Sequence, residues 1–505
     1  MPKAKTSSFI LELGLETNAH EETELNKRFE AARQLYNACL SEAKQRLDLL
    51  RQSKDFQDTR KMPKTVDGKS NKERTLKFKT LDAHFGFSEY DLHIYATKIR
   101  NSWIGNHIDS TTAQKVATRA FSAVQRVAFG IARRVRFKGK NQLKSVEGKT
   151  NQTGIRYIEE TGYIEWNGLK LKCAIDVNDE VVVYGLSHRV KYCRIIKRIF
   201  NGKSRFFIQL VLEGKPLKKF EVPDNTVGLD IGPSTIACVS DEHASIERFC
   251  DELKNKQKEL RRLQRKLDRQ RRANNPQNYN SDGTIKQGKK TWHYSTRYKK
   301  TSRKLAELQR KLAAHRKTLH GNLANCILKQ GKHIKTEKLS YRAFQKNYGR
   351  SVKDRAPGMF MEILRRKAEN ASGSVVEFST KETKLSQYCH KCGKYIKKPL
   401  SQRVHTCCNL NIQRDIYSAF LAGSVVENKL DTTDVQKRWW SMEAILQRAV
   451  SDVTQVASAP TCRDSFGRKV GDRATRLRSS DVPIISGIPL AKDRNVVAVQ
   501  LELFS

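Results

Sequence analysis

The stretch that most restricts the fold is residues 383–422, TKLSQYCHKCGKYIKKPLSQRVHTCCNLNIQRDIYSAFLA. It contains four cysteines in two pairs: Cys389, Cys392, Cys407 and Cys408. Seven residues after the second pair, Asp415 opens an apolar run with helical spacing. The sequence therefore predicts a metal-binding finger directly before an acid that a helix start would hold in a fixed position.

The cysteine pairs indicate a structural zinc site, because four thiolates suit tetrahedral Zn²⁺ and leave no coordination position open for catalysis. Cys389 and Cys392 have the Cys-x-x-Cys spacing of a zinc knuckle, whereas Cys407 and Cys408 are adjacent. His405 is an alternative to Cys407, because it stands two residues further from Cys408 and has the usual spacing. We favour the four cysteines as ligands. Four reduced cysteines without a metal are the remaining alternative.

Two earlier acids complete a candidate catalytic set with Asp415. Asp230 lies within an apolar strand pattern, VGLDIGPSTIACVS, and Glu337 falls near the end of a second predicted strand, His333–Leu339. A buried carboxylate is costly unless a metal or a hydrogen bond compensates it. Consecutive acids are more than 70 residues apart, so only the fold can bring them together. Three carboxylates at one cleft of an RNase H-like sheet would suit two Mg²⁺ ions. The alternative for Asp230 is an ordinary turn-stabilising residue.

The charge of the chain points to a polyanionic partner. The 505 residues include 97 Lys and Arg against 53 Asp and Glu, a formal net charge of +44. The excess is greatest in residues 251–330, with 23 Lys and Arg against 6 acids. Leucines at heptad-like spacing predict two antiparallel helices there, joined by the polar loop Asn274–Lys290. Nucleic acid is the expected partner, and an anionic membrane surface is the competing one.

The composition also restricts the compartment. No run of about 18 apolar residues could cross a bilayer, and the N-terminal residues MPKAKTSS lack the apolar core of a signal peptide. The 11 cysteines are too sparse for a disulfide scaffold. We therefore expect no membrane partner and a cytoplasmic, nucleoid-associated protein of a prokaryote.

Residues 136–225 have the pattern of short strands separated by turns. The predicted strands include Val181–Tyr184, Tyr192–Ile199 and Arg205–Glu213. Three cations on them are predicted either to follow a phosphate backbone or to form a solvated face: Arg194, Lys197 and Arg198.

Taken together, these motifs resemble the transposon-encoded TnpB nucleases and the related type V CRISPR effectors. The resemblance is carried by GLDIGPSTIA around Asp230, TEKLS around Glu337, CHKC…CC, NIQRDIYSAFLA around Asp415, and RAPGMF at 355–360. It covers residues 227–425 closely, with little motif support towards the N-terminus. The adjacent second cysteine pair departs from the usual finger of the family.

The resemblance implies a multidomain α+β protein with an N-terminal strand plus helical recognition lobe, a β-barrel wedge, and a C-terminal RNase H-like (RuvC) nuclease domain with an inserted zinc finger. The expected segments are 1–18 (first wedge strand), 19–135 (helical recognition lobe), 136–225 (wedge β-barrel), 226–382 (RuvC domain with the basic helical pair 248–330), 383–410 (zinc-finger insertion that binds target nucleic acid), 411–450 (C-terminal part of RuvC) and 451–505 (flexible tail).

The family further implies an RNA-guided endonuclease that cuts double-stranded DNA beside a short adjacent motif, with guide RNA and target DNA as partners. Asp230, Glu337 and Asp415 match its catalytic, Mg²⁺-binding acids, and Arg414 is expected to neutralise phosphate charge beside Asp415. We expect a monomer rather than a dimer. The alternatives are an RNA-guided DNA-binding protein without efficient cleavage and a DNA-strand-transfer transposase. A zinc-ribbon transcription factor would leave Asp230 and Glu337 unexplained.

Overall fold

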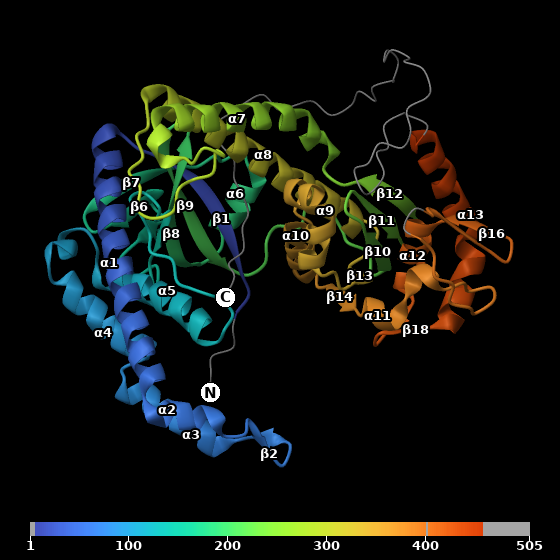
Figure 1. The fold of residues 1–505 in the computed structure, drawn as a ribbon, viewed down its shortest axis with the longest axis horizontal. Helices are drawn as coiled ribbons and strands as arrows, with labels where there is room; N and C mark the ends of the chain where they lie inside the picture. Colours follow the sequence, from blue (N-terminus) through green and yellow to red (C-terminus); the bar gives the residue numbers. More distant parts are fainter. Residues whose placement is uncertain (1–5, 400–401, 458–505) are drawn as a thin grey trace. The chain divides into compact units, whose positions relative to one another are not determined.

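The computed structural model describes residues 6–399 and 402–457, which form two compact units that divide after Leu217 (Figure 1). The last helix runs up to Ala457, so it includes the first residues of the expected flexible tail, 451–505. The rest of that tail lies outside the described residues. Within the described part of the chain, no helix has the length and apolar character needed to cross a bilayer.

The first unit is built on a seven-stranded antiparallel sheet with the order β4-β8-β9-β1-β7-β6-β5. The strand expected at the N-terminus is confirmed as β1 (Ser8–Glu16), and it lies at the centre of the sheet between β9 and β7. The other strands are β4 (Ser145–Glu147), β5 (Arg156–Ile158), β6 (Tyr163–Trp166), β7 (Leu169–Ala174), β8 (Val190–Phe200) and β9 (Lys203–Glu213). The expected barrel is not closed by strand pairing, because the three-residue strands β4 and β5 remain the two edges of the sheet.

Helices of the first unit share one hydrophobic core with this sheet. The longest, α1 (Ala19–Gln52), begins at Asn18, whose side chain and that of Glu21 form a capping box. The other helices are α2 (Lys54–Lys61), α3 (Lys72–His84), α4 (Glu89–Arg100), the 3-10 turn η1 (Trp103–Asn106) and α5 (Ser110–Ala128), with the small hairpin β2 (Thr65–Val66) and β3 (Lys69–Ser70) before α3. The helical segment and the β segment predicted from the sequence are therefore not separate cores.

One predicted strand of this unit is wrong. Val181–Tyr184 lies in a helix, α6 (Glu180–Leu186), although its β-branched residues favour a strand. Asp179 caps this helix by accepting a hydrogen bond from the Val181 N–H (2.8 Å), and Gly185 lets it pack closely against Leu11 of β1. Capping and packing therefore override the local propensity.

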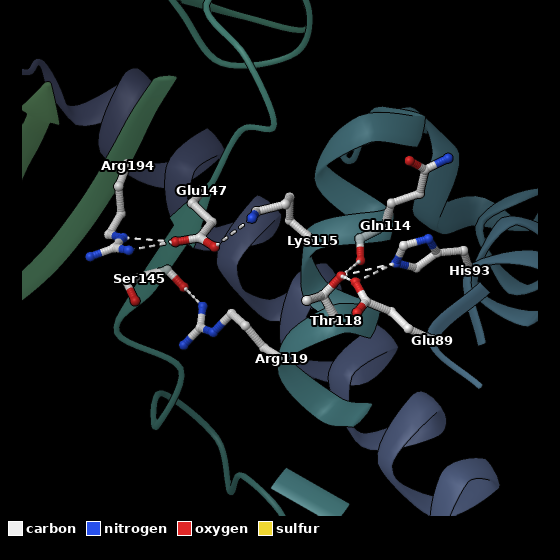
Figure 2. A network of polar contacts seen from close by, with 9 residues as sticks. All are labelled: Glu89, His93, Gln114, Lys115, Thr118, Arg119, Ser145, Glu147 and Arg194. Carbon is white, nitrogen blue, oxygen red and sulfur yellow. Dashed lines mark hydrogen bonds and ion pairs between the residues drawn. The ribbon is translucent and has the colours of Figure 1, made fainter. Parts of the chain in front are cut away.

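The cations of β8 are engaged inside the first unit. Arg194 donates to Glu147 of β4 (Nη2–Oε2 2.7 Å), which also lies 3.4 Å from Lys115 Nζ of α5 (Figure 2). Arg198 donates to the buried Glu12 (Nη2–Oε2 2.7 Å), and Lys197 is itself buried. Each of these cations thus compensates or joins a buried polar group, which supports a structural role for them, while phosphate binding by them stays a prediction.

Glu147 is the centre of a polar network between the sheet and the helices (Figure 2). Burial opposes its ionisation, but the charges of Arg194 and Lys115 outweigh burial and lower the pKa of Glu147. Beside it, Arg119 of α5 donates to the carbonyl oxygen of Ser145 (2.7 Å). The network therefore ties β4 to α5 and to β8.

The second unit contains a five-stranded sheet with the order β12-β11-β10-β13-β14. Its strands are β10 (Thr226–Ile231), β11 (Thr235–Val239), β12 (Ala244–Arg248), β13 (His333–Glu337) and β14 (Ser374–Phe378). The first three form an antiparallel meander, and β13 and β14 run parallel to β10. The strands predicted around Asp230 and before Glu337 are confirmed.

Two hydrophobic clusters cover opposite faces of this sheet, since alternate residues of β11 belong to different clusters. One cluster joins Ala237 and Val239 to α12 (Arg414–Gly423) and α13 (Thr432–Ala457). The other joins Ile236 and Cys238 to α8 (Thr296–Leu328) and α10 (Pro357–Asn370). The result is a helix–sheet–helix sandwich.

The predicted pair of basic helices is confirmed as α7 (Gln257–Asn274) and α8, which pack against each other. The remaining elements are η2 (Asp251–Lys256), η3 (Pro276–Asn278), α9 (Tyr341–Arg355), α11 (Thr380–Thr383), η4 (Leu385–Gln387), the hairpin β15 (Val404–Cys407) and β16 (Leu410–Gln413), and the hairpin β17 (Val425–Val426) and β18 (Lys429–Leu430).

Candidate functional site

Asp230 and Glu337 lie side by side on neighbouring parallel strands. Leu229 of β10 pairs with Thr336 of β13, and each acid is the next residue along its strand. Because side chains alternate between the two faces of a sheet, and Leu229 and Thr336 are buried on one face, both acids point to the other face. The register alone therefore brings together two residues that are far apart in the sequence.

Gly228 allows the third acid to approach. It stands two residues before Asp230 and faces the same side, where α12 packs on β10. A Cβ atom at this position would overlap the carbonyl oxygen of Ala419 and lie 2.7 Å from the backbone nitrogen of Gly423. The absence of a side chain therefore lets α12 lie flat against the strand that carries Asp230.

Asp415 occupies the first turn of α12, as the sequence predicts. Gln413 caps the helix by accepting a hydrogen bond from the Ile416 N–H (Oε1–N 2.7 Å). An acid in the first turn is also favoured by the positive end of the helix dipole. The helix start thus fixes the backbone of Asp415 on the face of the sheet that carries Asp230 and Glu337.

Besides burial, the charges of Asp415 and Glu337 raise the pKa of Asp230. Burial, followed by the negative charges of Asp415 and Glu337, raises the pKa of Asp230 well above its ordinary value, while Arg414 and Arg403 oppose the shift. Burial also raises the pKa of Glu337. Burial and the neighbouring acids thus make a charged Asp230 unfavourable, and carboxyls with pKa values perturbed in this way are common at functional sites.

Two arginines flank Asp415. Arg414 Nε lies 3.6 Å from Asp415 Oδ1, but the side chain is only 11 % exposed and donates to the Gln402 carbonyl oxygen (3.0 Å). Arg403 Nη1 lies 3.8 Å from Asp415 Oδ2, and its side chain is 51 % exposed. Arg403 is thus better placed than Arg414 to meet a phosphate, and sequence adjacency gave no signal for it.

The three carboxylates are chemically suited to a divalent metal ion, but their oxygen atoms are not as close to one another as the sulfur atoms of the cysteine cluster. They supply hard oxygen donors, which Mg²⁺ prefers, and the raised pKa of Asp230 indicates uncompensated charge that a cation would relieve. Among the described residues, the set whose ligand atoms all lie within 4.8 Å of one another is the cysteine cluster alone. Asp230, Glu337 and Asp415 would be the residues that hold a divalent ion.

The four predicted cysteines do converge. The sulfur atoms of Cys389, Cys392, Cys407 and Cys408 all lie within 4.8 Å of one another. The backbone N–H of Lys394 lowers the pKa of Cys392 to about 7, whereas the neighbouring thiols raise the pKa of Cys407 to about 12. Four thiols this close cannot all ionise without a cation, so the cluster suits a tetrahedral metal such as zinc.

Two backbone turns explain how an adjacent pair of cysteines reaches the same point as a spaced pair. At the knuckle, the Gly393 N–H donates to the Cys389 carbonyl (2.8 Å), and Gly393 takes a positive φ of 68°. On the other side, Cys407 ends β15, and the hairpin turns through Cys408 and Asn409 with φ of 52° and 59°. The left-handed conformation of Cys408 turns its sulfur towards Cys407 (3.6 Å).

His405 is not part of this cluster. Its side chain is buried, packs on the ring of Tyr417 (centroids 4.6 Å apart) and accepts a hydrogen bond at Nδ1 from Lys398 Nζ (2.5 Å). Tyr417 belongs to α12, and its hydroxyl oxygen accepts a hydrogen bond from the His390 N–H (3.0 Å). Tyr417 therefore fastens the cysteine finger to the helix that carries Asp415, a role that sequence reasoning missed.

Comparisons with known proteins agree with these segments. Residues 209–347 match a family model described as a probable transposase (OrfB_IS605), and residues 358–421 match the TNB-domain model of Cas12f1-like proteins. The first match contains Asp230 and Glu337, and the second contains Asp415 and the four cysteines. The predicted resemblance to the TnpB family and compact type V effectors is confirmed.

Similar solved structures include Cas12f1 in a cryo-EM complex with sgRNA and target DNA, at 13 % identity and a TM-score of 0.48, over 82 % of this chain and 98 % of that chain. They also include a CRISPR-Cas12f ternary complex, at 12 % identity and a TM-score of 0.26, over 80 % of this chain and 82 % of that chain. No curated protein matches the chain.

Proposed function

We propose that this relative of the TnpB nucleases and compact type V effectors is an RNA-guided DNA endonuclease with a RuvC-type active site. The observation that carries the proposal is geometric: the register of β10 and β13 sets Asp230 beside Glu337 on the face of a five-stranded sheet where α12 packs, with Asp415 in its first turn. The antiparallel meander followed by two parallel strands supports an RNase H-like arrangement of that sheet.

Asp230, Glu337 and Asp415 would hold two Mg²⁺ ions, which would supply an activated water and stabilise the leaving 3′ oxygen of a phosphodiester. The rigid register of β10 and β13 orients the first two carboxylates. The packing of α12 on Gly228 orients the third. Arg403, half exposed beside Asp415, would bind the phosphate that approaches the acids. Because one chain supplies all three carboxylates, a monomer is sufficient for the complete site.

The partners in this proposal are a guide RNA and a double-stranded DNA target beside a short motif. The net charge of +44 supports a polyanion as partner, and the family models that match the chain favour this class of protein. Base pairing with the guide would supply sequence specificity, while the protein holds the heteroduplex mainly through its backbone.

The cysteine cluster would bind structural zinc and hold the finger that precedes Asp415. If all four cysteines are ligands, Cys407→Ser will lower the zinc content of the purified protein, as measured by elemental analysis. His405→Asn serves as the matched control and will retain zinc, because His405 packs on Tyr417 instead of the cluster. Zinc loss in the histidine variant with retention in the serine variant would reverse this assignment.

The test of the proposal begins with the RNA that copurifies when the gene is expressed with its flanking DNA. A discrete RNA with a constant scaffold and a variable end is expected. The purified complex is then incubated with Mg²⁺ and a double-stranded DNA that matches the variable end. Cleavage that disappears in Asp230→Ala supports the proposal. Heterogeneous RNA, or cleavage that survives the substitution, would contradict guidance or the RuvC assignment respectively.

A strand-transfer transposase is the second candidate, because the model matched by residues 209–347 is described as a probable transposase. Such an enzyme also uses three acids, but it joins a DNA 3′ hydroxyl to a new strand. Joined products in the same Mg²⁺ assay, rather than hydrolysed ends, would favour it. Target binding without either product would favour the guided DNA-binding alternative.

A further inference from the structure

Four aromatic residues at the tip of the α7–α8 pair belong to none of the three hydrophobic cores. They are Tyr279, Trp292, Tyr294 and Tyr298. We define the α7–α8 tip as residues 271–300, which comprise the end of α7, the connecting segment and the start of α8. Because these aromatics do not stabilise a core of the protein, their clustering in a polar segment requires another explanation.

The aromatics are arranged in two pairs. Tyr294 and Tyr298 stack with ring centroids 4.6 Å apart and an interplanar angle of 25°, and Tyr294 is 43 % exposed. Tyr279 and Trp292 meet edge to face at 5.9 Å. The stacked pair thus presents an accessible aromatic ring that is already oriented by a neighbour.

Arginines cover the second pair. Arg271 lies over the ring of Trp292 (5.5 Å to the centroid), and Arg272 lies over the ring of Tyr279 (4.9 Å). Both arginines also contact Asp268 of α7. These contacts hold Tyr279 and Trp292 in place, and of the four aromatic rings Tyr294 is the exposed one, stacked on the partly buried Tyr298.

The connecting segment is ordered by asparagine side chains. The buried Asn275 donates to the Arg271 and His293 carbonyls (both 2.9 Å), and Asn278 donates to the Thr291 carbonyl (2.8 Å). These bonds join the two ends of the connection, so the aromatic pairs are oriented before any partner binds. Such preorganisation lowers the entropic cost of binding.

The charge around the aromatics has one sign. Residues 275–304 contain eight Lys and Arg against one acid, Asp282. The exposed cations nearest to the stacked tyrosines in sequence are Arg297, Lys299 and Lys300. The start of α8, capped by Ser295, adds the positive end of a helix dipole to the same segment. An accessible stacked aromatic pair within a basic segment is the combination that binds single-stranded nucleic acid.

We propose that the α7–α8 tip is a platform on which unpaired bases of a single-stranded nucleic acid stack, with the flanking cations holding the backbone phosphates. The partner is either single-stranded RNA or an unpaired DNA strand, since both present the same base faces and phosphates. This inference shares with the proposed function a nucleic-acid partner, but it requires neither guidance nor cleavage.

The experiment uses the full-length protein freed of RNA and fluorescently labelled strands of about 12 nucleotides: oligouridine RNA, oligothymidine DNA and an abasic DNA of equal length. Binding is followed by fluorescence anisotropy at a salt concentration that weakens binding of the abasic strand. The ratio of affinities for base-bearing and abasic strands then measures stacking. The double substitution Tyr294→Ala with Tyr298→Ala is compared with Tyr294→Phe with Tyr298→Phe, which keeps both rings.

We expect the alanine variant to lose about tenfold in affinity for base-bearing strands, with little change for the abasic strand, because stacking on an aromatic ring contributes substantially for each base. The phenylalanine variant and Trp440→Ala, which removes an 83 % exposed aromatic from α13, are expected to bind as the wild type does. If the alanine variant loses affinity for oligouridine alone or for oligothymidine alone, that strand is the partner. If it loses affinity for both, the platform binds single-stranded RNA and single-stranded DNA alike.

An unchanged ratio of base-bearing to abasic affinity in the alanine variant would overturn the platform. Equal losses for base-bearing and abasic strands would also overturn it, because the tip would then act through charge or folding alone. Neither result would affect a positive cleavage assay, and failure of guided cleavage would leave this binding test intact. The two proposals therefore fail separately.

Discussion

Glu147 in the first unit and Asp230 in the second are both carboxylates placed among packed elements, yet their pKa values shift in opposite directions. Arg194 and Lys115 lower the pKa of Glu147 against the effect of burial. Burial and two neighbouring acids raise the pKa of Asp230. The charge of Glu147 is therefore compensated by neighbouring cations. The neighbours that raise the pKa of Asp230 are instead two further acids, Asp415 and Glu337.

This contrast separates a structural acid from a candidate functional one. A compensated acid contributes to folding stability, because removing it would leave its partners as partly buried cations without an acid beside them. An uncompensated cluster costs stability in the isolated protein and gains it when a cation binds. Burial raises the pKa of both acids, so the neighbouring charges are what distinguish them, and each of the following predictions tests this difference.

The largest expected effect is on cleavage by the Asp230→Asn variant. Removing a carboxylate that binds catalytic metal forfeits several kcal/mol of transition-state stabilisation, so we expect the rate to fall roughly 10³-fold. Single-turnover cleavage of a guide-matched DNA measures this rate. Asp241→Asn is the matched control, since that acid is 57 % exposed and pairs with Arg438 away from the three acids. Equal losses in both variants would remove the distinction between the two kinds of acid.

The next effect concerns stability in the first unit. Glu147→Ala leaves Arg194 and Lys115 without their acid, and the Glu147 side chain is only 12 % exposed. We expect a loss of about 3 kcal/mol in the free energy of unfolding, as for other broken buried pairs. Urea denaturation of the RNA-free protein measures it. Glu165→Ala, on β6, is a suitable comparison and should cost less, because its partners Arg156 and Lys170 are more exposed.

The two units also differ in which features could be predicted from the sequence. The strands around Asp230 and Glu337 were predictable, because short apolar runs bounded by turn residues favour strands, although the same kind of pattern at Val181–Tyr184 belongs to a helix. The register that sets the two acids side by side was not, since it depends on contacts across about a hundred residues. Gly228 offered a usable signal, because a glycine two positions before a strand-borne acid shares its face.

Pairings between charged residues were harder to predict from the sequence. Arg194 and Arg198 carry the same charge signal as a phosphate-binding strand, and their partners, Glu147 and Glu12, lie on other strands. The cysteine spacing predicted the cluster, but the exclusion of His405 required the left-handed turn at Cys408 and the packing of His405 on Tyr417. Local patterns thus indicate which residues take part, and tertiary structure decides their partners.

A smaller effect of opposite sign is expected for stability in the second unit. In protein stripped of divalent metal, Asp230→Asn removes repulsion with Asp415 and Glu337. We expect the free energy of unfolding of the variant to exceed that of the wild type, by less than the loss expected for Glu147→Ala. Thermal or urea unfolding in EDTA measures the gain, and adding Mg²⁺ should stabilise the wild type but not the variant. Destabilisation in EDTA would show that Asp230 is compensated like Glu147.

The smallest expected effect is the pH dependence of these two differences. The folded-state pKa of Glu147 is lowered, so its contribution to stability is present above the unfolded pKa, about 4.3, and is lost as pH falls through the folded pKa. The folded-state pKa of Asp230 is raised, so its contribution is complete below the unfolded pKa, about 3.9, and is lost as pH rises through the folded pKa.

In EDTA, the loss of unfolding free energy in Glu147→Gln should therefore shrink on acidification. The gain of unfolding free energy in Asp230→Asn should shrink as well. Urea unfolding of both variants and the wild type, from neutral pH to below the unfolded pKa of Glu147 of about 4.3, measures the two slopes. A deficit of Glu147→Gln that grows on acidification would contradict compensation by Arg194 and Lys115, because protonated Glu147 no longer attracts either cation.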